Sequence, residues 1–237
     1  MWRFVSLMWF NNTGVHMKTL LFLLILFFIP FQIAAVDLTD MEQLGKELFF
    51  DKISSPDNMS CATCHAPQVG FTGPIGGINA HGAVYRGAVP TRFGNRKPPS
   101  AAYATLSPTF HYDEEEGLFV GGNFWDGRAT GEALGNPAAD QALGPFLNPV
   151  EQNNPSKGAV LKQIAESKYA DLWEKAWGEP IVYDTEEEIE KNYDRVGLAI
   201  AKYEDSEEVN AFSSKYDYYL LCKVELTEEE AWGLELF

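Results

Sequence analysis

Residues 61–65, which read Cys-Ala-Thr-Cys-His, constrain this chain more than any other segment. Two cysteines three positions apart can each form a thioether with a vinyl group of one porphyrin. The histidine that follows is then delivered to the iron as an axial ligand. The pattern therefore predicts covalent haem c, attached at Cys61 and Cys64 with His65 as the proximal ligand, and it predicts redox chemistry.

A CxxC pair has two other common uses. A thioredoxin-like redox pair follows a strand of a βαβ unit, and no such pattern surrounds residue 61. A structural zinc site needs about four ligands, and only Cys222 and distant histidines remain to complete one. Both interpretations are therefore weaker than haem attachment.

Composition limits the partners of the protein. The chain has 237 residues and a net charge of −16, with 18 Lys and Arg against 34 Asp and Glu. A chain this acidic is not expected to bind nucleic acid. Its acidity suits a basic redox partner, or serves solubility alone. The length allows one large domain or two small ones.

The N-terminal segment has the pattern of an export signal. From Met17 a positively charged start is followed by an apolar run over 20–29 and by small residues up to Ala35. Pro30 interrupts the run well short of the ~20 residues that a spanning helix needs. We therefore predict a signal peptide at 1–35, with Met17 as an alternative start, export to the periplasm and no stable membrane span. Export agrees with haem c, which is attached outside the cytoplasm.

Twelve residues near the start of the mature chain recur at its end. The segment LTDMEQLGKELF (38–49) aligns without gaps with LTEEEAWGLELF (226–237), and seven of the twelve positions are identical. In each copy Thr is followed three residues later by Glu, a capping box that predicts a helix start. We interpret the match as a repeat rather than as two similar helix starts. Residues 36–223 then form one haem domain, and 224–237 begin a second, truncated one.

The rest of the chain predicts helices and long loops. Residues 66–124 are rich in Gly, Pro and Ser with little periodicity, so we expect ordered loops over the haem. Residues 158–177 have the period of one helix, and 185–203 form another, opened by the capping box of Thr185 and Glu188. The candidates for the buried face of the first helix are Ile164, Leu172 and Trp173. No convincing run of alternating strands appears along the chain. We therefore predict a mainly α fold, with one cytochrome c-like haem domain and the first helix of a second such domain.

The second axial ligand of the iron is often Met or His. All five methionines precede residue 61, whereas His/Met electron carriers take the methionine from well after the motif. His81 lies among glycines, a flexible setting from which a ligand can reach the iron and leave it again. His111 adjoins an acidic run at 113–116. We favour His81 as the distal ligand, with His111 and an open site as the alternatives.

Cys222 is left over once the motif cysteines hold haem. Mostly apolar or aromatic residues precede it over 218–221. We therefore predict a small buried residue rather than a reactive thiol.

Several segments of the chain, taken together, resemble the bacterial di-haem cytochrome c peroxidase family, which includes the MauG-like proteins. The resemblance covers about residues 38–152 in the order of the family, with the start of a second domain at 226–237. It implies two c-type haem domains, with peroxide reacting at the N-terminal haem. The segments that carry it are LGKELFFD (44–51), the CATCH motif, the glycine-flanked His81, FWDGR (124–128), and Gly144-Pro145 followed by Glu151.

The resemblance also implies roles for single residues. His65 would be the proximal ligand and His81 the distal ligand, which in many members moves away on activation. Trp125 would lie between the haems and pass electrons. Gln141 and Glu151 would stand beside the distal face of the haem.

The chemistry of peroxide cleavage gives these pocket residues a use. Heterolysis of H2O2 needs a proton moved from one oxygen to the other, and a well-placed carboxylate contributes typically 10²–10⁴-fold. Glu151 would move this proton while Gln141 orients the peroxide. Without the motif, Glu151 would be called a surface carboxylate and Trp125 core packing. Arg128 pairs either with a haem propionate or with a carboxylate such as that of Asp126.

The sequence departs from the family in two places. The family often has an Asn that serves a calcium site between the domains, where this chain has Lys97. Because a lysine cannot ligate calcium, that metal is doubtful here. The larger departure is the missing second CxxCH: this chain would hold one haem c, and a second is expected in a full-length protein.

We therefore predict an exported haem oxidoreductase that reduces hydrogen peroxide to water with electrons from a small cytochrome c or copper protein. One alternative is a non-enzymatic electron-transfer cytochrome with a closed bis-His haem. Another is a MauG-like oxidase acting on a protein or organic substrate. The oligomeric state stays open, with a homodimer as one option.

Overall fold

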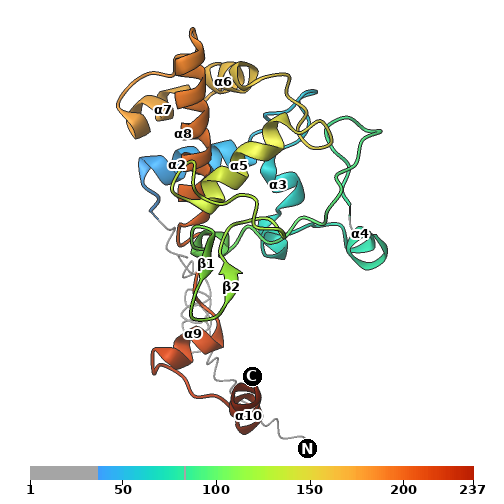
Figure 1. Cartoon of the computed structure of the whole chain (residues 1–237), viewed down its shortest axis with the longest axis vertical. Coiled ribbons are helices and arrows are strands. Elements are labelled where there is room, and N and C mark those ends of the chain that lie inside the picture. Colours follow the sequence, from blue (N-terminus) through green and yellow to red (C-terminus); the bar gives the residue numbers. More distant parts are fainter. Residues whose placement is uncertain (1–36, 83) are drawn as a thin grey trace, which may run out of the picture. The chain divides into compact units, whose positions relative to one another are not determined.

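The computed structural model describes residues 37–82 and 84–237, so the predicted signal peptide lies outside the described residues. Helices dominate the described chain, as Figure 1 shows, which confirms the mainly α class. No helix within these ranges is both long and apolar enough to span a bilayer. In chain order the elements are α2 (Asp40–Phe50), α3 (Cys61–Cys64), η1 (Pro67–Val69), α4 (Gly76–His81), η2 (Ala104–Leu106), β1 (His111–Asp113), β2 (Leu118–Val120), α5 (Pro137–Leu147), α6 (Lys157–Ala165), α7 (Ala170–Trp177), α8 (Glu186–Glu204), α9 (Lys215–Leu220) and α10 (Glu228–Leu236).

Helix α2 begins at its predicted capping box and packs along α8. The backbone N–H of Glu42 donates to the Thr39 hydroxyl oxygen (3.3 Å), and the Glu42 carboxylate accepts from the Thr39 backbone N–H (2.7 Å). Gly45 faces the backbone of α8, where a Cβ added to it would lie 1.9 Å from the carbonyl oxygen of Ala199. The missing side chain therefore lets the two helices approach closely.

One apolar core joins α2 and α5 through α8. The ring of Phe49 meets those of Phe71 (6.1 Å between centroids) and Tyr203 (5.5 Å) edge to face. This contact ties α2 and α8 to the loop after α3. Fully burying such a side chain contributes about 1.5–3 kcal/mol. The largest buried side chains of the core are Leu44, Leu48, Phe49, Ile53, Phe146, Leu161, Ile164, Trp173, Tyr193, Ile200 and Tyr203.

The single helix predicted over 158–177 is wrong, because the structure has two helices there, α6 and α7, separated by a turn at 166–169. In one continuous helix Ile164 and Trp173 would be about two and a half turns apart and so on opposite faces. The turn lets both side chains reach the core, where both are fully buried. Leu172 is partly buried against the same core.

Helix α8 confirms the prediction for 185–203. It opens with the capping box of Thr185 and Glu188 and ends at Glu204. Among the described residues of 66–124 the elements are short, as expected for a loop-rich segment. They include one antiparallel hairpin, in which His111 pairs with Val120 and Asp113 with Leu118.

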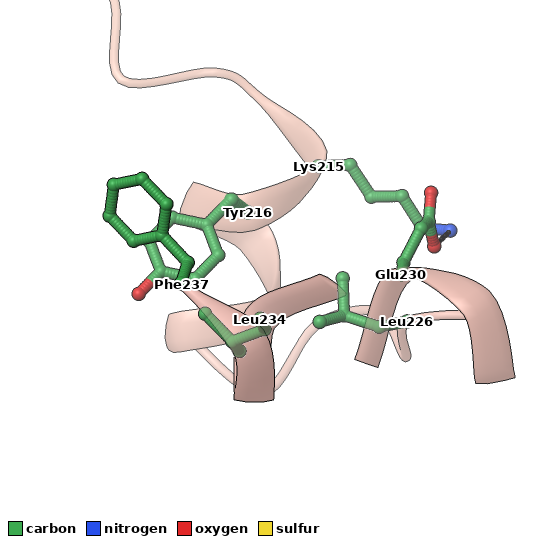
Figure 2. Close-up of a pocket in the computed structure, with 6 residues that line it drawn as sticks. All are labelled: Lys215, Tyr216, Leu226, Glu230, Leu234 and Phe237. Atoms are coloured by element: carbon green, nitrogen blue, oxygen red, sulfur yellow. Dashed lines mark hydrogen bonds and ion pairs between the residues drawn. The ribbon is translucent and has the colours of Figure 1, made fainter. Parts of the chain in front are cut away.

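Helix α10 repeats the start of α2. The capping box of Thr227 and Glu230 is closed, with a 2.7 Å bond from the Thr227 backbone N–H to the Glu230 carboxylate. A Cβ added to Gly233 would have nothing within 4 Å, in contrast to Gly45. Figure 2 shows the pocket between α9 and α10, where Lys215 forms an ion pair with Glu230 beside apolar side chains. The apolar residues of this pocket are Tyr216, Leu226, Leu234 and Phe237.

The prediction that Cys222 is buried is wrong, because its side chain is exposed. Its neighbours Leu220 and Leu221 are each 60% exposed. The two buried clusters of the described residues do not include this segment, so apolar composition did not bring burial here.

Candidate functional site

The CxxCH residues lie on α3, a single helical turn. The backbone N–H of Ser60 donates to the Thr63 hydroxyl oxygen (3.0 Å) and fixes the start of this turn. Residues three apart on a helix are neighbours on one face. Cys61 and Cys64 are both free thiols and both partly exposed. The turn therefore presents two thiols to the same side, as one porphyrin requires.

The side chain of His65 is held by two carbonyl oxygens. Its Nδ1 lies 2.9 Å from the oxygen of Pro99 and 3.2 Å from that of Phe71. A nitrogen facing two acceptors must carry the proton, so Nε2 is the unprotonated nitrogen, the form that binds a metal. Burial lowers the pKa of His65, and the two bonds to carbonyl groups oppose this in part. The ring is therefore held in the neutral form, which is the form that can bind a metal.

Both thiols resist ionisation. Burial, together with the negative charge of Glu204, raises the pKa of Cys61 to about 12. Burial, together with the charge of Glu151, raises the pKa of Cys64 to about 11. A thioredoxin-like pair needs a lowered thiol pKa, so these environments disfavour that use of the CxxC pair.

Glu151 lies in the loop after α5, on the side of the motif. The amide Nδ2 of Asn148 donates to its Oε2 (3.0 Å), and its charge acts on Cys64. Burial raises the pKa of Glu151, while the Asn148 bond and the positive charge of Arg128 lower it in part. The structure therefore brings together Cys64 and Glu151, which are far apart in sequence. Gln141 lies on α5 and is partly exposed.

The FWDGR segment is at the surface of the described chain. Trp125 is 72% exposed, with the guanidinium of Arg96 4.8 Å from its ring centre. The core-packing alternative for this tryptophan is therefore wrong. Arg128 pairs with Asp126 (2.8 Å) and covers the ring of Phe124 (3.7 Å), while its pairing with a haem propionate stays a prediction.

The structure does not bring the other two histidines to His65. His81 is the last residue of α4 and is exposed, and Figure 1 shows α4 apart from α3. His111 lies in β1, with its Nδ1 2.8 Å from the carbonyl oxygen of Thr109. The assignment of His81 as the distal ligand stays a prediction. In the described ranges no three His, Cys, Asp or Glu side chains cluster as a metal-ion site.

Sequence reasoning missed two buried polar residues beside Cys61. Gln152 is 3% exposed, its Nε2 lies 3.7 Å from the Cys61 sulfur, and its Oε1 is buried without a partner. Glu204 is 4% exposed. The signal for Glu204 was its spacing from Val196 and Ile200, which puts a carboxyl group on the apolar face of α8.

These residues fit a covalently attached haem. Two thiols face one way, His65 has a free Nε2, and the unpartnered Oε1 of Gln152 lies beside the Cys61 sulfur. The helical fold and this CxxCH site together define the class of c-type haem proteins.

Comparison with known proteins narrows the class to a family. The family model described as "Di-haem cytochrome c peroxidase" matches residues 39–225. The chain belongs to this family of haem oxidoreductases. The family resemblance found in the sequence is thus confirmed.

The individual relatives include a MauG protein and peroxidases. Over 196 residues the chain is 36% identical to the methylamine utilization protein MauG of Paracoccus denitrificans, covering 82% of this chain and 48% of MauG. Over 212 residues it is 27% identical to the cytochrome c551 peroxidase of Nitrosomonas europaea, covering 88% and 52%. The structure of the diheme peroxidase BthA from Burkholderia thailandensis superposes with a TM-score of 0.70 at 32% identity, covering 86% of this chain and 47% of BthA. The chain spans about half the length of these relatives.

Proposed function

We propose that this chain is the peroxide-reacting part of an exported haem oxidoreductase. It would reduce H2O2 to two waters with two protons and two electrons, the electrons coming from a small cytochrome c or copper protein. The observation that carries the proposal is Glu151, a partly buried carboxyl group held by Asn148 on the Cys64 side of the CxxCH motif. Haem attached at Cys61 and Cys64 supplies peroxide binding and electron transfer.

The chain's own residues would handle the protons. The Oε2 atom of Glu151 is occupied by the Asn148 amide, and no hydrogen bond to Oε1 occurs among the described residues. Oε1 is then free to accept a proton from one peroxide oxygen and return it to the other. The raised pKa of Glu151 suits this exchange, because a proton carrier works best with a pKa closer to the working pH. Gln141 would orient the peroxide from α5.

Electrons would enter on the side of Trp125. Its exposed ring, stacked under Arg96, is available to a neighbouring redox centre. In a longer protein that centre would be a second haem c, in a domain that begins with the repeat at 224–237. The same family resemblance supports a periplasmic location and leaves calcium doubtful at Lys97.

His81 would control access to the site. It lies at the end of a six-residue helix whose N-terminal half contains Gly76 and Gly77. A ligand on such a segment can bind the iron and leave it when the site is activated.

A MauG-like oxidase is the second candidate function. The observation that favours it is the 36% identity to MauG of Paracoccus denitrificans. In that case the oxidising equivalents from peroxide would pass to a protein or organic substrate, again through the side of the molecule that carries Trp125.

Steady-state kinetics tests the proposal. The haem-loaded protein, with any missing domain restored, is given H2O2 and a reduced small cytochrome c, and donor oxidation is followed by absorption. The proposal expects peroxide-dependent donor oxidation. A reduced protein that stays low-spin and does not react with peroxide would contradict it. Rapid reaction with peroxide without donor turnover would favour the MauG-like alternative.

A further inference from the structure

Glu204 is a carboxyl group buried without a counter-charge. It ends α8 on the face that carries Val196 and Ile200, and 4% of the residue is exposed. The described chain provides no ion pair and no hydrogen bond to its carboxylate. A buried carboxyl group without a partner is costly in its charged form. Glu204 in its charged form therefore does not stabilise the core, which indicates another role for it.

The first thiol of the CxxCH motif packs against the same apolar core as Val196 and Ile200, which share the face of α8 with Glu204. The charge of Glu204 raises the pKa of Cys61, so the carboxyl group is electrostatically coupled to this sulfur. Gln152 contacts the same sulfur with its Nε2 (3.7 Å), while its Oε1 has no partner. The polar groups around Cys61 are thus the side-chain amide of Gln152 and the carboxyl group of Glu204. Of these two, only the carboxyl group can change its charge.

Other charged groups on the elements around α8 do not compensate Glu204. Burial alone raises its pKa, to about 8, with no contribution from another charge. Several charged groups on these elements have partners elsewhere, and the titratable neighbours Tyr203 and Cys64 are themselves buried or partly buried. The engaged groups are Lys46 with Glu208, Glu47 with Lys168, Asp140 with the backbone N–H groups of Gly131 and Leu134, Lys157 with Glu190, Lys162 with Glu166, and Asp205 with Thr105.

We propose that Glu204 binds a proton when the haem attached at Cys61 is reduced and releases it when that haem is oxidised. The inference rests on haem attachment at this motif, as in the proposed function. In the coupled step the site gains one electron from the donor, and the Glu204 carboxylate gains one proton from solvent. A negative charge beside the site disfavours the electron, and neutralising it favours the electron. Glu204 thereby makes reduction depend on pH.

The midpoint potential of the haem, measured against pH, tests this role. The haem-loaded chain is titrated by spectroelectrochemistry from about pH 6 to about pH 9, a range that spans the titration of Glu204. The reduction equilibrium constant of the wild-type protein should fall at least about threefold across this range, which is about 28 mV at 59 mV per tenfold for one electron. In Glu204→Gln the equilibrium constant should fall less than in the wild-type protein over the same range.

A matched variant isolates the residue. Glu208→Gln removes a carboxylate four positions further on, at the surface beside Lys46, and should follow the wild-type curve. Any pH dependence that the three proteins share cancels in the comparison, so only the difference between the curves belongs to Glu204. A Glu204→Gln curve that falls as steeply as the wild-type curve overturns the proposal.

Infrared difference spectroscopy on the wild-type protein gives a test that does not depend on the variant folding. Reduction at about pH 8 should produce a carbonyl band of a protonated carboxyl group that shifts on ¹³C labelling of glutamate. Absence of such a band contradicts the proposal. Neither measurement uses peroxide. If both give the expected result and the protein does not turn over peroxide, only the proposed function is contradicted. A chain that attaches no haem would overturn both.

Discussion

The Nδ1 atom of His65 lies 2.9 Å from the carbonyl oxygen of Pro99. This bond joins the CxxCH motif to a loop 34 residues further along the chain and turns the opposite nitrogen, Nε2, into the free one. The loop-rich segment 66–124 therefore does more than cover the core, because its carbonyl oxygen at Pro99 fixes the proton on Nδ1 of His65.

Replacing Glu151 by Gln tests the proton carrier. Gln keeps the size of the side chain but cannot exchange the proton, so kcat/KM for H2O2 should fall about 10²–10⁴-fold. The measurement is donor oxidation at saturating reduced cytochrome. Glu166→Gln is the control, since Glu166 is exposed and pairs only loosely with Lys162 (3.8 Å). Unchanged turnover in Glu151→Gln would remove Glu151 from the mechanism.

Replacing His81 by Gly tests the distal ligand. If His81 binds the iron, its loss should convert a six-coordinate, low-spin absorption spectrum to a high-spin one. His111→Gly removes the other candidate from β1 and should leave the spectrum as it is. A change with His111→Gly and none with His81→Gly would show that the wrong histidine has been assigned.

The repeat offers a pair of matched stability variants. Gly45→Ala places a Cβ against the Ala199 carbonyl of α8 and should lower the free energy of unfolding by about 1–3 kcal/mol or more. Gly233→Ala meets no neighbour within 4 Å and should stabilise α10 by about 0.5–1 kcal/mol through helix propensity. Urea unfolding of the two variants measures the difference. Equal losses would contradict the packing of α2 on α8.

The pH dependence of stability should report Glu204. Burial raises the pKa of this carboxyl group from 4.5 to about 8. The folded state therefore binds its proton more tightly than the unfolded state. The resulting stabilisation is complete below about pH 4.5 and is lost as pH rises through about 8, a loss on the order of 5 kcal/mol.

In Glu204→Gln this loss should disappear, which urea midpoints of the haem-loaded chain at about pH 6 and about pH 9 would show. Glu208→Gln again serves as the control. If wild-type and Glu204→Gln midpoints fall equally between the two pH values, Glu204 does not titrate as its burial implies.

Local signals in the sequence predicted local structure well. The capping boxes of Thr39, Thr185 and Thr227 each open a helix, because the bonds that make them span three residues. The periodicity over 158–177 failed at the turn, because period alone does not reveal that Ile164 and Trp173 must share one core.

The candidate site was predictable only in part. The motif at 61–65 carries its chemistry within five residues, so Cys61 and Cys64 could be proposed as the haem-attachment residues from sequence alone. Gln152 contacts Cys61, and the charge of Glu204 acts on it, across more than 90 residues of chain, which no short pattern records. Cys222 shows the reverse error, since apolar neighbours in sequence did not provide a core around it.

The intact mass of the chain tests the central claim most directly. After production in a host that attaches c-type haem, the denatured wild-type protein should carry the added mass of one haem for its one CxxCH motif. A variant with both Cys61→Ala and Cys64→Ala should carry none. An unmodified mass for the wild-type protein, or retained covalent haem in the double variant, would contradict the account.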